Sequence, residues 1–180
     1  MVVVNINIGG QWLYIDRPEE VSESVARVLA SLSGEVSTPV YNPGDDAWFM
    51  IGDRKHESET DLPDNFLRVS VNWATGFGGM VWFLSSDSST TSSVGDSVWV
   101  SNNPQPPDFD PRVVADPGGP VFHDRRSALP ISQVAEVVER FCIAATGDRP
   151  SGVDWVQGDV AGRRADRQHE AELPEVDPFA

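Results

Sequence analysis

The stretch from Asn65 to Phe83, NFLRVSVNWATGFGGMVWF, is the sequence feature that most constrains the fold. In its first part, apolar residues lie close to alternate positions, which is the period of a β-strand. A second run of residues that favour strands, Met80 to Phe83, closes it. The residues between, 74–79, include three glycines, which adopt positive φ without steric cost. We therefore predict an antiparallel hairpin at the centre of a sheet, with 74–79 as its turn.

The opening of the chain predicts a second hairpin followed by a helix. Residues 2–8 alternate in the manner of a strand, and 11–15 return as a strand after a Gly-Gly turn. Apolar residues then recur at helical spacing from Val21 to Leu32. Residues 35–46 contain prolines, a glycine and two aspartates, which predicts an irregular connection.

The later part of the chain predicts short strands and one more helix. An apolar face at helical spacing runs from Ile131 to Cys142. A serine-rich segment at 85–93 and a proline-rich segment at 102–111 are typical of surface connections. The remaining strands are predicted at 47–52, 98–100, 121–122 and 153–156.

These elements together predict one α+β domain over residues 1–157. We expect a mostly antiparallel sheet of six or seven strands, with both helices packed on one face. Residues 158–180 are charged and almost devoid of large apolar side chains, which predicts a disordered tail.

The charge of the chain limits the partners that it can bind. Its 28 acidic and 13 basic residues give a net charge of −15. Nucleic acids and anionic membranes need clustered positive charge, so we predict that the protein binds neither. The acidic excess is compatible with a basic protein partner, which it would attract over a long range. A general role in solubility is the alternative interpretation.

Cysteine usage and hydropathy predict a cytoplasmic protein. Cys142 is the only cysteine, so no intramolecular disulfide can form, and its place on the predicted helix favours a small core residue. No basic segment followed by an apolar run opens the chain, and no window approaches eighteen consecutive apolar residues.

The sequence contains no pattern typical of an enzyme site. None of the three histidines has a second histidine or cysteine at metal-ligand spacing, and the serine-rich segment lacks G-x-S-x-G. The glycines at 76–79 precede a predicted strand rather than the helix that a phosphate cradle needs. We therefore predict no catalytic residue, metal or cofactor. The alternative is a small ligand-binding protein or hydrolase that uses His123 and Asp124.

Several short motifs resemble a known family. They are TGFGG at 75–79 followed by Trp82, LPI at 129–131 with Gln133, and TGDRP at 146–150 followed by Trp155. In these residues the chain resembles the first-numbered family of immunity proteins from bacterial polymorphic toxin systems. The resemblance covers residues 66 to 156.

The resemblance implies an inhibitor without enzymatic activity. Members of that family are typically encoded beside toxins with a nucleic-acid deaminase domain, and are thought to neutralise the cognate toxin by binding it. The expected partner is therefore a basic toxin domain, a zinc-dependent deaminase, and an acidic chain could occupy its nucleic-acid path. A general mimic of DNA that inhibits unrelated proteins is a further alternative.

Acidic and aromatic residues are the candidates for contact with the toxin. Tryptophan contributes much of the binding energy at protein interfaces, while charges set association rate and specificity. Six tryptophans are present, and some follow aspartates closely. The predicted contact residues are Asp45, Asp46, Trp48, Phe77, Asp87, Trp99, Asp108 and Asp110.

Overall fold

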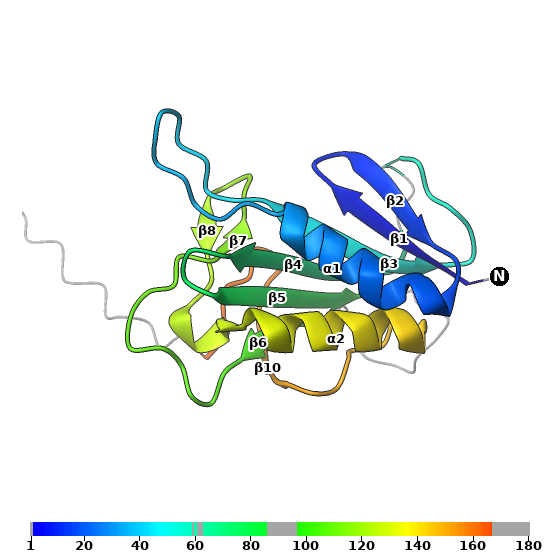
Figure 1. The fold of residues 1–180 in the computed structure, drawn as a ribbon. Coiled ribbons are helices and arrows are strands. Elements are labelled where there is room, and N and C mark those ends of the chain that lie inside the picture. Colours follow the sequence, from blue (N-terminus) through cyan, green and yellow to red (C-terminus); the bar gives the residue numbers. More distant parts are fainter. Residues whose placement is uncertain (1, 59, 61–62, 86–96, 167–180) are drawn as a thin grey trace, which may run out of the picture.

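The computed structural model describes residues 2–58, 60, 63–85 and 97–166 (Figure 1). Its main element is an antiparallel sheet in the order β10–β6–β5–β4–β3–β1–β2, with β9 paired to the start of β5. A separate hairpin is formed by β7 and β8. The strands are β1 (Val3–Ile8), β2 (Gln11–Ile15), β3 (Asp46–Gly52), β4 (Asn65–Asn72), β5 (Phe77–Leu84), β6 (Ser97–Asn102), β7 (Val114–Asp116), β8 (Val121–Phe122), β9 (Leu129–Pro130) and β10 (Asp154–Gln157).

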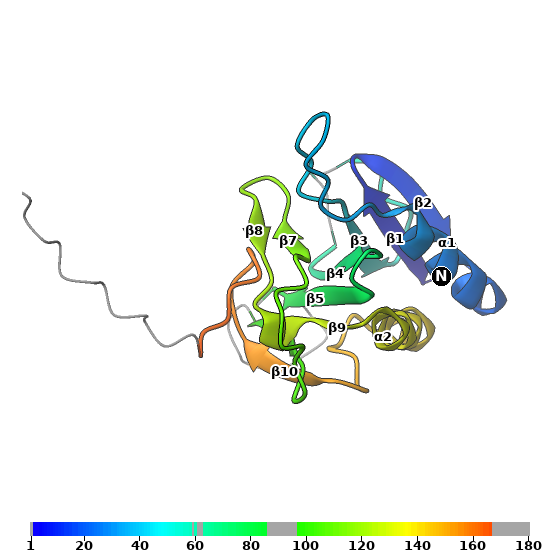
Figure 2. The same ribbon diagram turned by 60° about the vertical axis from the view of Figure 1, so that its left-hand side comes forward.

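Two α-helices cover one face of this sheet (Figures 1 and 2). They are α1 (Val21–Ser31), which follows the short 3-10 helix η1 (Pro18–Glu20), and α2 (Ile131–Ala144), which follows η2 (Arg125–Ser127) and β9. The predicted α+β fold with both helices on one face is therefore confirmed. Within the described part of the chain, neither helix has the length and apolar character needed to cross a membrane.

The main hydrophobic core lies between the helices and the sheet. The apolar faces that the helical spacing predicted are buried there, and the helix-facing positions of the central strands meet them. Cys142 is buried in this core, as predicted. The most deeply buried side chains of this core include Ile6, Val25, Leu29, Phe49, Leu67, Val69, Met80, Val138 and Phe141.

The central hairpin forms as predicted, but its turn is shorter than 74–79. The turn occupies residues 73–76, with Gly76 at φ 78°, and β5 already begins at Phe77. Gly78 and Gly79 are therefore strand residues. A Cβ on Gly78 would lie 2.8 Å from the Ser70 carbonyl oxygen, and one on Gly79 would overlap the His123 ring. These two glycines serve close packing across the strand, a use that sequence alone did not separate from turn formation.

The second face of the sheet is covered only in part. The β7–β8 hairpin packs over β4 and β5 on this side, opposite the helices (Figure 2). The segment 158–166 also packs here, with Gly162 against Ala115 and with Arg164 buried. The chain thus continues in contact with the sheet beyond the predicted domain end at 157. Residues 167–180 lie outside the described part, and their disorder stays a prediction.

Residues 33–45, here called the arm, connect α1 to β3 and project from the body of the molecule (Figures 1 and 2). The prolines and glycine that predicted an irregular connection leave only one backbone bridge within it, between Val36 and Asn42. Asp46 was predicted to lie in this connection, but it is the first residue of β3.

Candidate functional site

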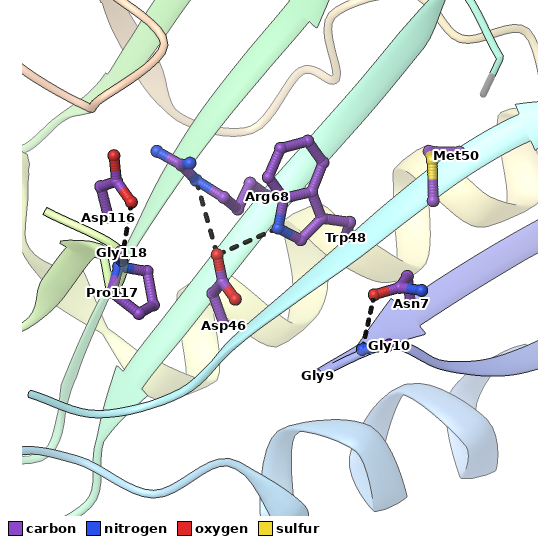
Figure 3. A pocket seen from close by; sticks show the side chains of 10 residues that line it. All are labelled: Asn7, Gly9, Gly10, Asp46, Trp48, Met50, Arg68, Asp116, Pro117 and Gly118. Atoms are coloured by element: carbon purple, nitrogen blue, oxygen red, sulfur yellow. Dashed lines mark hydrogen bonds and ion pairs between the residues drawn. The ribbon is translucent and has the colours of Figure 1, made fainter. Parts of the chain in front are cut away.

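A groove of about 440 Å³ lies on the sheet face opposite the helices, at the end that the β7–β8 hairpin partly covers (Figure 3). We call it the acidic groove. Its walls come from the β1–β2 turn, from β3 and β4, and from the β7–β8 hairpin. Its lining residues are Asn7, Gly9, Gly10, Asp46, Trp48, Met50, Arg68, Asp116, Pro117 and Gly118.

Strand alternation places the central side chains of the groove. Asp46 and Trp48 are two residues apart on β3, so both point away from the helices, while Ala47 between them enters the core. Arg68 on β4 is the register partner of Trp48. Asp116, the last residue of β7, completes the opposite wall. Four charged or aromatic side chains from three strands therefore meet in one place.

Asp46, Trp48 and Arg68 hold one another (Figure 3). The indole Nε1 of Trp48 donates a hydrogen bond to Asp46 Oδ2 at 3.0 Å, and the same oxygen lies 3.9 Å from Arg68 Nε. The Arg68 guanidinium lies 5.3 Å from the centroid of the Trp48 ring, within the range of a cation–π contact. This network fixes the indole in one orientation.

Burial makes the charges of this network costly. Arg68 is only 5% exposed, and burial lowers its pKa, although the carboxylates of Asp46, Asp116 and Asp159 act in the opposite direction. Burial likewise raises the pKa of Asp46, partly offset by its hydrogen bond with Trp48. With two carboxylates and one guanidinium in its lining, the groove carries a negative net charge. A cation from a partner would find a favourable potential there.

Two buried donors of the groove lack an acceptor. Among the described residues, Asn7 Nδ2 and Arg68 Nε have no hydrogen-bond partner, although Arg68 Nη2 donates to the Val160 carbonyl oxygen. A buried donor without an acceptor costs free energy, about 1–3 kcal/mol for a neutral group. Both donors are buried beneath the surface of the groove, so this cost is borne by the folded protein itself.

A row of aromatic side chains extends the acidic groove across the same face. The Trp48 and Phe66 rings are 4.5 Å apart, and Phe66 stacks on Phe83 at 4.9 Å. Trp12 of β2 and Val98 of β6 pack against the same buried cluster, which Met50, Phe66 and Val81 form beneath the row. Trp48 and Phe83 remain partly exposed, so the row combines packed rings with accessible aromatic surface. Such a surface next to charged groups is typical of protein interfaces.

The predicted contact residues divide among several places. Asp46 and Trp48 lie in the acidic groove. Asp45 does not, because it accepts hydrogen bonds from the backbone amide and the hydroxyl of Ser33 and so closes the base of the arm. Trp99 lies on the helix side, where the Arg149 guanidinium is 4.0 Å from its ring centroid. Asp87 lies outside the described residues.

The other three candidates lie near the β4–β5 turn. The Phe77 ring meets Phe109 edge to face at 5.8 Å. Asp108 and Asp110 are exposed on either side of Phe109, and Asp110 accepts a hydrogen bond from the Arg112 amide. None of the three lines the acidic groove. Their role in binding stays a prediction.

Arg68, Asn7 and Asp116 belong to the site but were not predicted. Arg68 did carry a signal, because an arginine between apolar residues of a central strand needs a nearby carboxylate. Asn7 and Asp116 carried none, since their positions depend on which strands become neighbours.

His123 and Asp124, the residues of the alternative site, each have a structural role. His123 is 4% exposed, and burial lowers its pKa to about 3, so the ring is neutral at neutral pH. Asp124 accepts from the Arg126 backbone amide and side chain at the start of η2. Among the described residues, no three His, Cys, Asp or Glu side chains come close enough to hold a metal ion.

Comparison with known proteins gives one match. The family described as Immunity protein Imm1 matches residues 9–157, a span that includes most of the groove lining and every predicted contact residue. No curated protein and no solved structure matches the chain.

Proposed function

Because the chain belongs to the Imm1 immunity protein family, we propose that it neutralises one cognate toxin domain by binding it through the acidic groove and the aromatic row. The inhibitor acts by occupying the toxin and carries out no reaction itself. Its binding face is the side of the sheet that the helices leave open (Figure 2).

The acidic groove is the observation that carries this proposal. It brings two carboxylates and a fixed indole to one accessible hollow, next to partly exposed aromatic rings. A basic side chain of the toxin would pair with Asp46 and Asp116 in the groove. Aromatic contacts then hold the complex, while the net charge of −15 speeds encounter.

We further propose that the toxin is a zinc-dependent nucleic-acid deaminase of a polymorphic toxin system. An enzyme of this class needs a positively charged path to its pocket, because its substrate is a polyanion. The carboxylates of the groove have the charge needed to compete with phosphates for that path. The motifs at 75–79, 129–131 and 146–150, which resemble those of immunity proteins paired with deaminases, support the same choice.

Binding and inhibition of the toxin encoded beside this protein test the proposal. The purified pair should form a one-to-one complex, and deamination of single-stranded DNA or RNA should stop at equimolar inhibitor. Co-expression should also restore growth. If growth is not restored and no complex forms, the proposed function is wrong. If the complex forms but the toxin has no deaminase activity, only the class of toxin is wrong.

A charge-neutral double variant tests the groove itself. Asp46→Asn with Asp116→Asn should weaken toxin binding about tenfold or more, and should reduce the salt dependence of association. The control is Asp53→Asn with Asp148→Asn, which removes the same charge from exposed positions outside the groove and should change affinity less than about twofold. Because Asp46→Asn also leaves Arg68 without its ion pair, Asp116→Asn alone provides the second measurement. Equal affinities for all variants would contradict the groove as the contact.

A further inference from the structure

The outer part of the arm, residues 36–44, carries no charged side chain, although the protein has a net charge of −15. In the whole chain 23% of residues are charged, but the nine residues from Val36 to Gly44, VSTPVYNPG, include no ionisable acid or base other than Tyr41. The arm also projects away from the body, so its outer residues do not cover the core (Figures 1 and 2).

The outer residues of the arm expose apolar surface. Val40 is 77% exposed, the highest value among the large hydrophobic residues that the structure describes, and Val36 and Tyr41 are nearly half exposed. Trp73, which is 52% exposed, follows Asn72, whose side chain lies directly against Gly34 at the base of the arm. These four apolar residues therefore belong to one end of the molecule.

The base of the arm is firmly held. Arg112 Nε donates to Glu35 Oε2 at 2.8 Å, and the same guanidinium lies 3.7 Å from the Phe122 ring centroid. Val36 and Asn42 exchange two backbone hydrogen bonds of 2.8 and 2.7 Å across the arm. Asp45 and Ser33 close its two ends. An exposed apolar tip on a fixed base loses little conformational entropy when it binds.

The arm is continuous with the acidic groove. Asp45 ends the arm and Asp46, the next residue, lines the groove, so one partner surface can reach both. The two contacts differ in chemistry, because the groove offers charge and the arm offers uncharged, convex apolar surface. A convex apolar tip gains most from burial in a concave apolar surface.

We propose that the arm inserts its Val40 tip into an apolar hollow of the same toxin domain, beside the cationic surface that the groove binds. This inference rests on the proposed function. Carboxylates of the groove govern how fast the complex forms, and the arm governs how slowly it dissociates. The contact of the arm is insensitive to salt, because no charge takes part in it.

Association and dissociation rates of the intact protein with the toxin test this role. Val40→Ser should raise the dissociation rate roughly tenfold and leave the association rate and its salt dependence unchanged. The matched control is Ile143→Ser, which removes an aliphatic side chain that is 61% exposed on α2. It should leave both rates unchanged. Both variants should unfold at the wild-type temperature, since each site is exposed.

The outcomes separate this inference from the proposed function. If wild-type protein does not bind the toxin, the proposed function fails. If wild-type protein binds and Val40→Ser dissociates at the wild-type rate, the arm is no toxin contact and the proposed function still stands. If Val40→Ser instead abolishes a homodimer in sedimentation without changing toxin affinity, the arm serves a second copy of this chain and the inference is overturned.

Discussion

At the scale of single residues, the burial of ionisable groups on the open face of the sheet has consequences for stability. His123 packs against Gly79 of β5, and its Nδ1 has no hydrogen-bond partner in the described part of the chain. Burial lowers its pKa to about 3, with a further contribution from the nearby positive charge of Arg68. The folded protein therefore excludes a proton that the unfolded chain accepts near pH 6.5, the ordinary pKa of histidine. Acid should destabilise the fold through this residue.

We predict that His123 makes the free energy of unfolding fall on acidification from about pH 6.5 downwards, by up to about 1.4 kcal/mol for each pH unit until about pH 3. Between pH 7 and pH 5 the loss should be about 2 kcal/mol. Urea unfolding at both pH values should show this extra loss of stability in wild type and not in His123→Gln. The variant retains every carboxylate, so the effect of acid on those groups is the same in both proteins. The NMR chemical shifts of the His123 ring should not change between pH 7 and pH 5. A ring that titrates near pH 6.5 would contradict the assignment.

At the scale of the elements, the central hairpin depends on residues that have no side chain. Gly78 on β5 faces α2, where its missing Cβ leaves room for Val134 and for the Ser70 carbonyl of β4. This glycine therefore allows α2 to pack closely against the sheet at Val134. The predicted turn was too long because it included this glycine. Periodicity alone cannot distinguish a glycine of a turn from a strand glycine that packs under a helix.

Gly78→Ala should destabilise the fold by about 1–3 kcal/mol, because the new Cβ would lie 2.8 Å from a backbone oxygen that cannot move alone. Gly119→Ala is the control, since its nearest neighbour would be 4.0 Å away, and it should change stability by less than about 0.5 kcal/mol. Thermal and urea unfolding measure both. Equal stability of the two variants would show that both β4 and α2 can shift to accept the methyl group.

At the scale of the whole molecule, the sequence predicted the helices and strands better than it predicted which of them contact one another. The hairpins and both helices followed from local periodicity and turn residues, and the structure confirms them. The acidic groove did not follow, because Asn7, Arg68 and Asp116 are far apart in the chain and meet only through the order of the strands. Asp45 and Asp46 could not be distinguished in the sequence. In the structure β3 begins at Asp46, so the Asp46 side chain lines the groove, while the Asp45 side chain accepts a hydrogen bond from Ser33 at the base of the arm.

Two neighbouring contacts of different chemistry should contribute independently to one affinity. Val40 is not part of the groove lining, so Val40→Ser should leave the Asp46–Trp48–Arg68 network intact. We therefore expect the effects of Val40→Ser and Asp116→Asn on the free energy of toxin binding to add to within about 0.5 kcal/mol in the double variant. Titration calorimetry of the two single variants and the double variant measures this sum.

The kinetics of the same double variant should separate the two contributions. Asp116→Asn should account for its loss of salt-dependent association, and Val40→Ser should account for its faster dissociation. Strong coupling between the two changes would contradict this division. It would mean that the toxin closes on the arm and the acidic groove as a single unit, so that neither contact forms fully without the other.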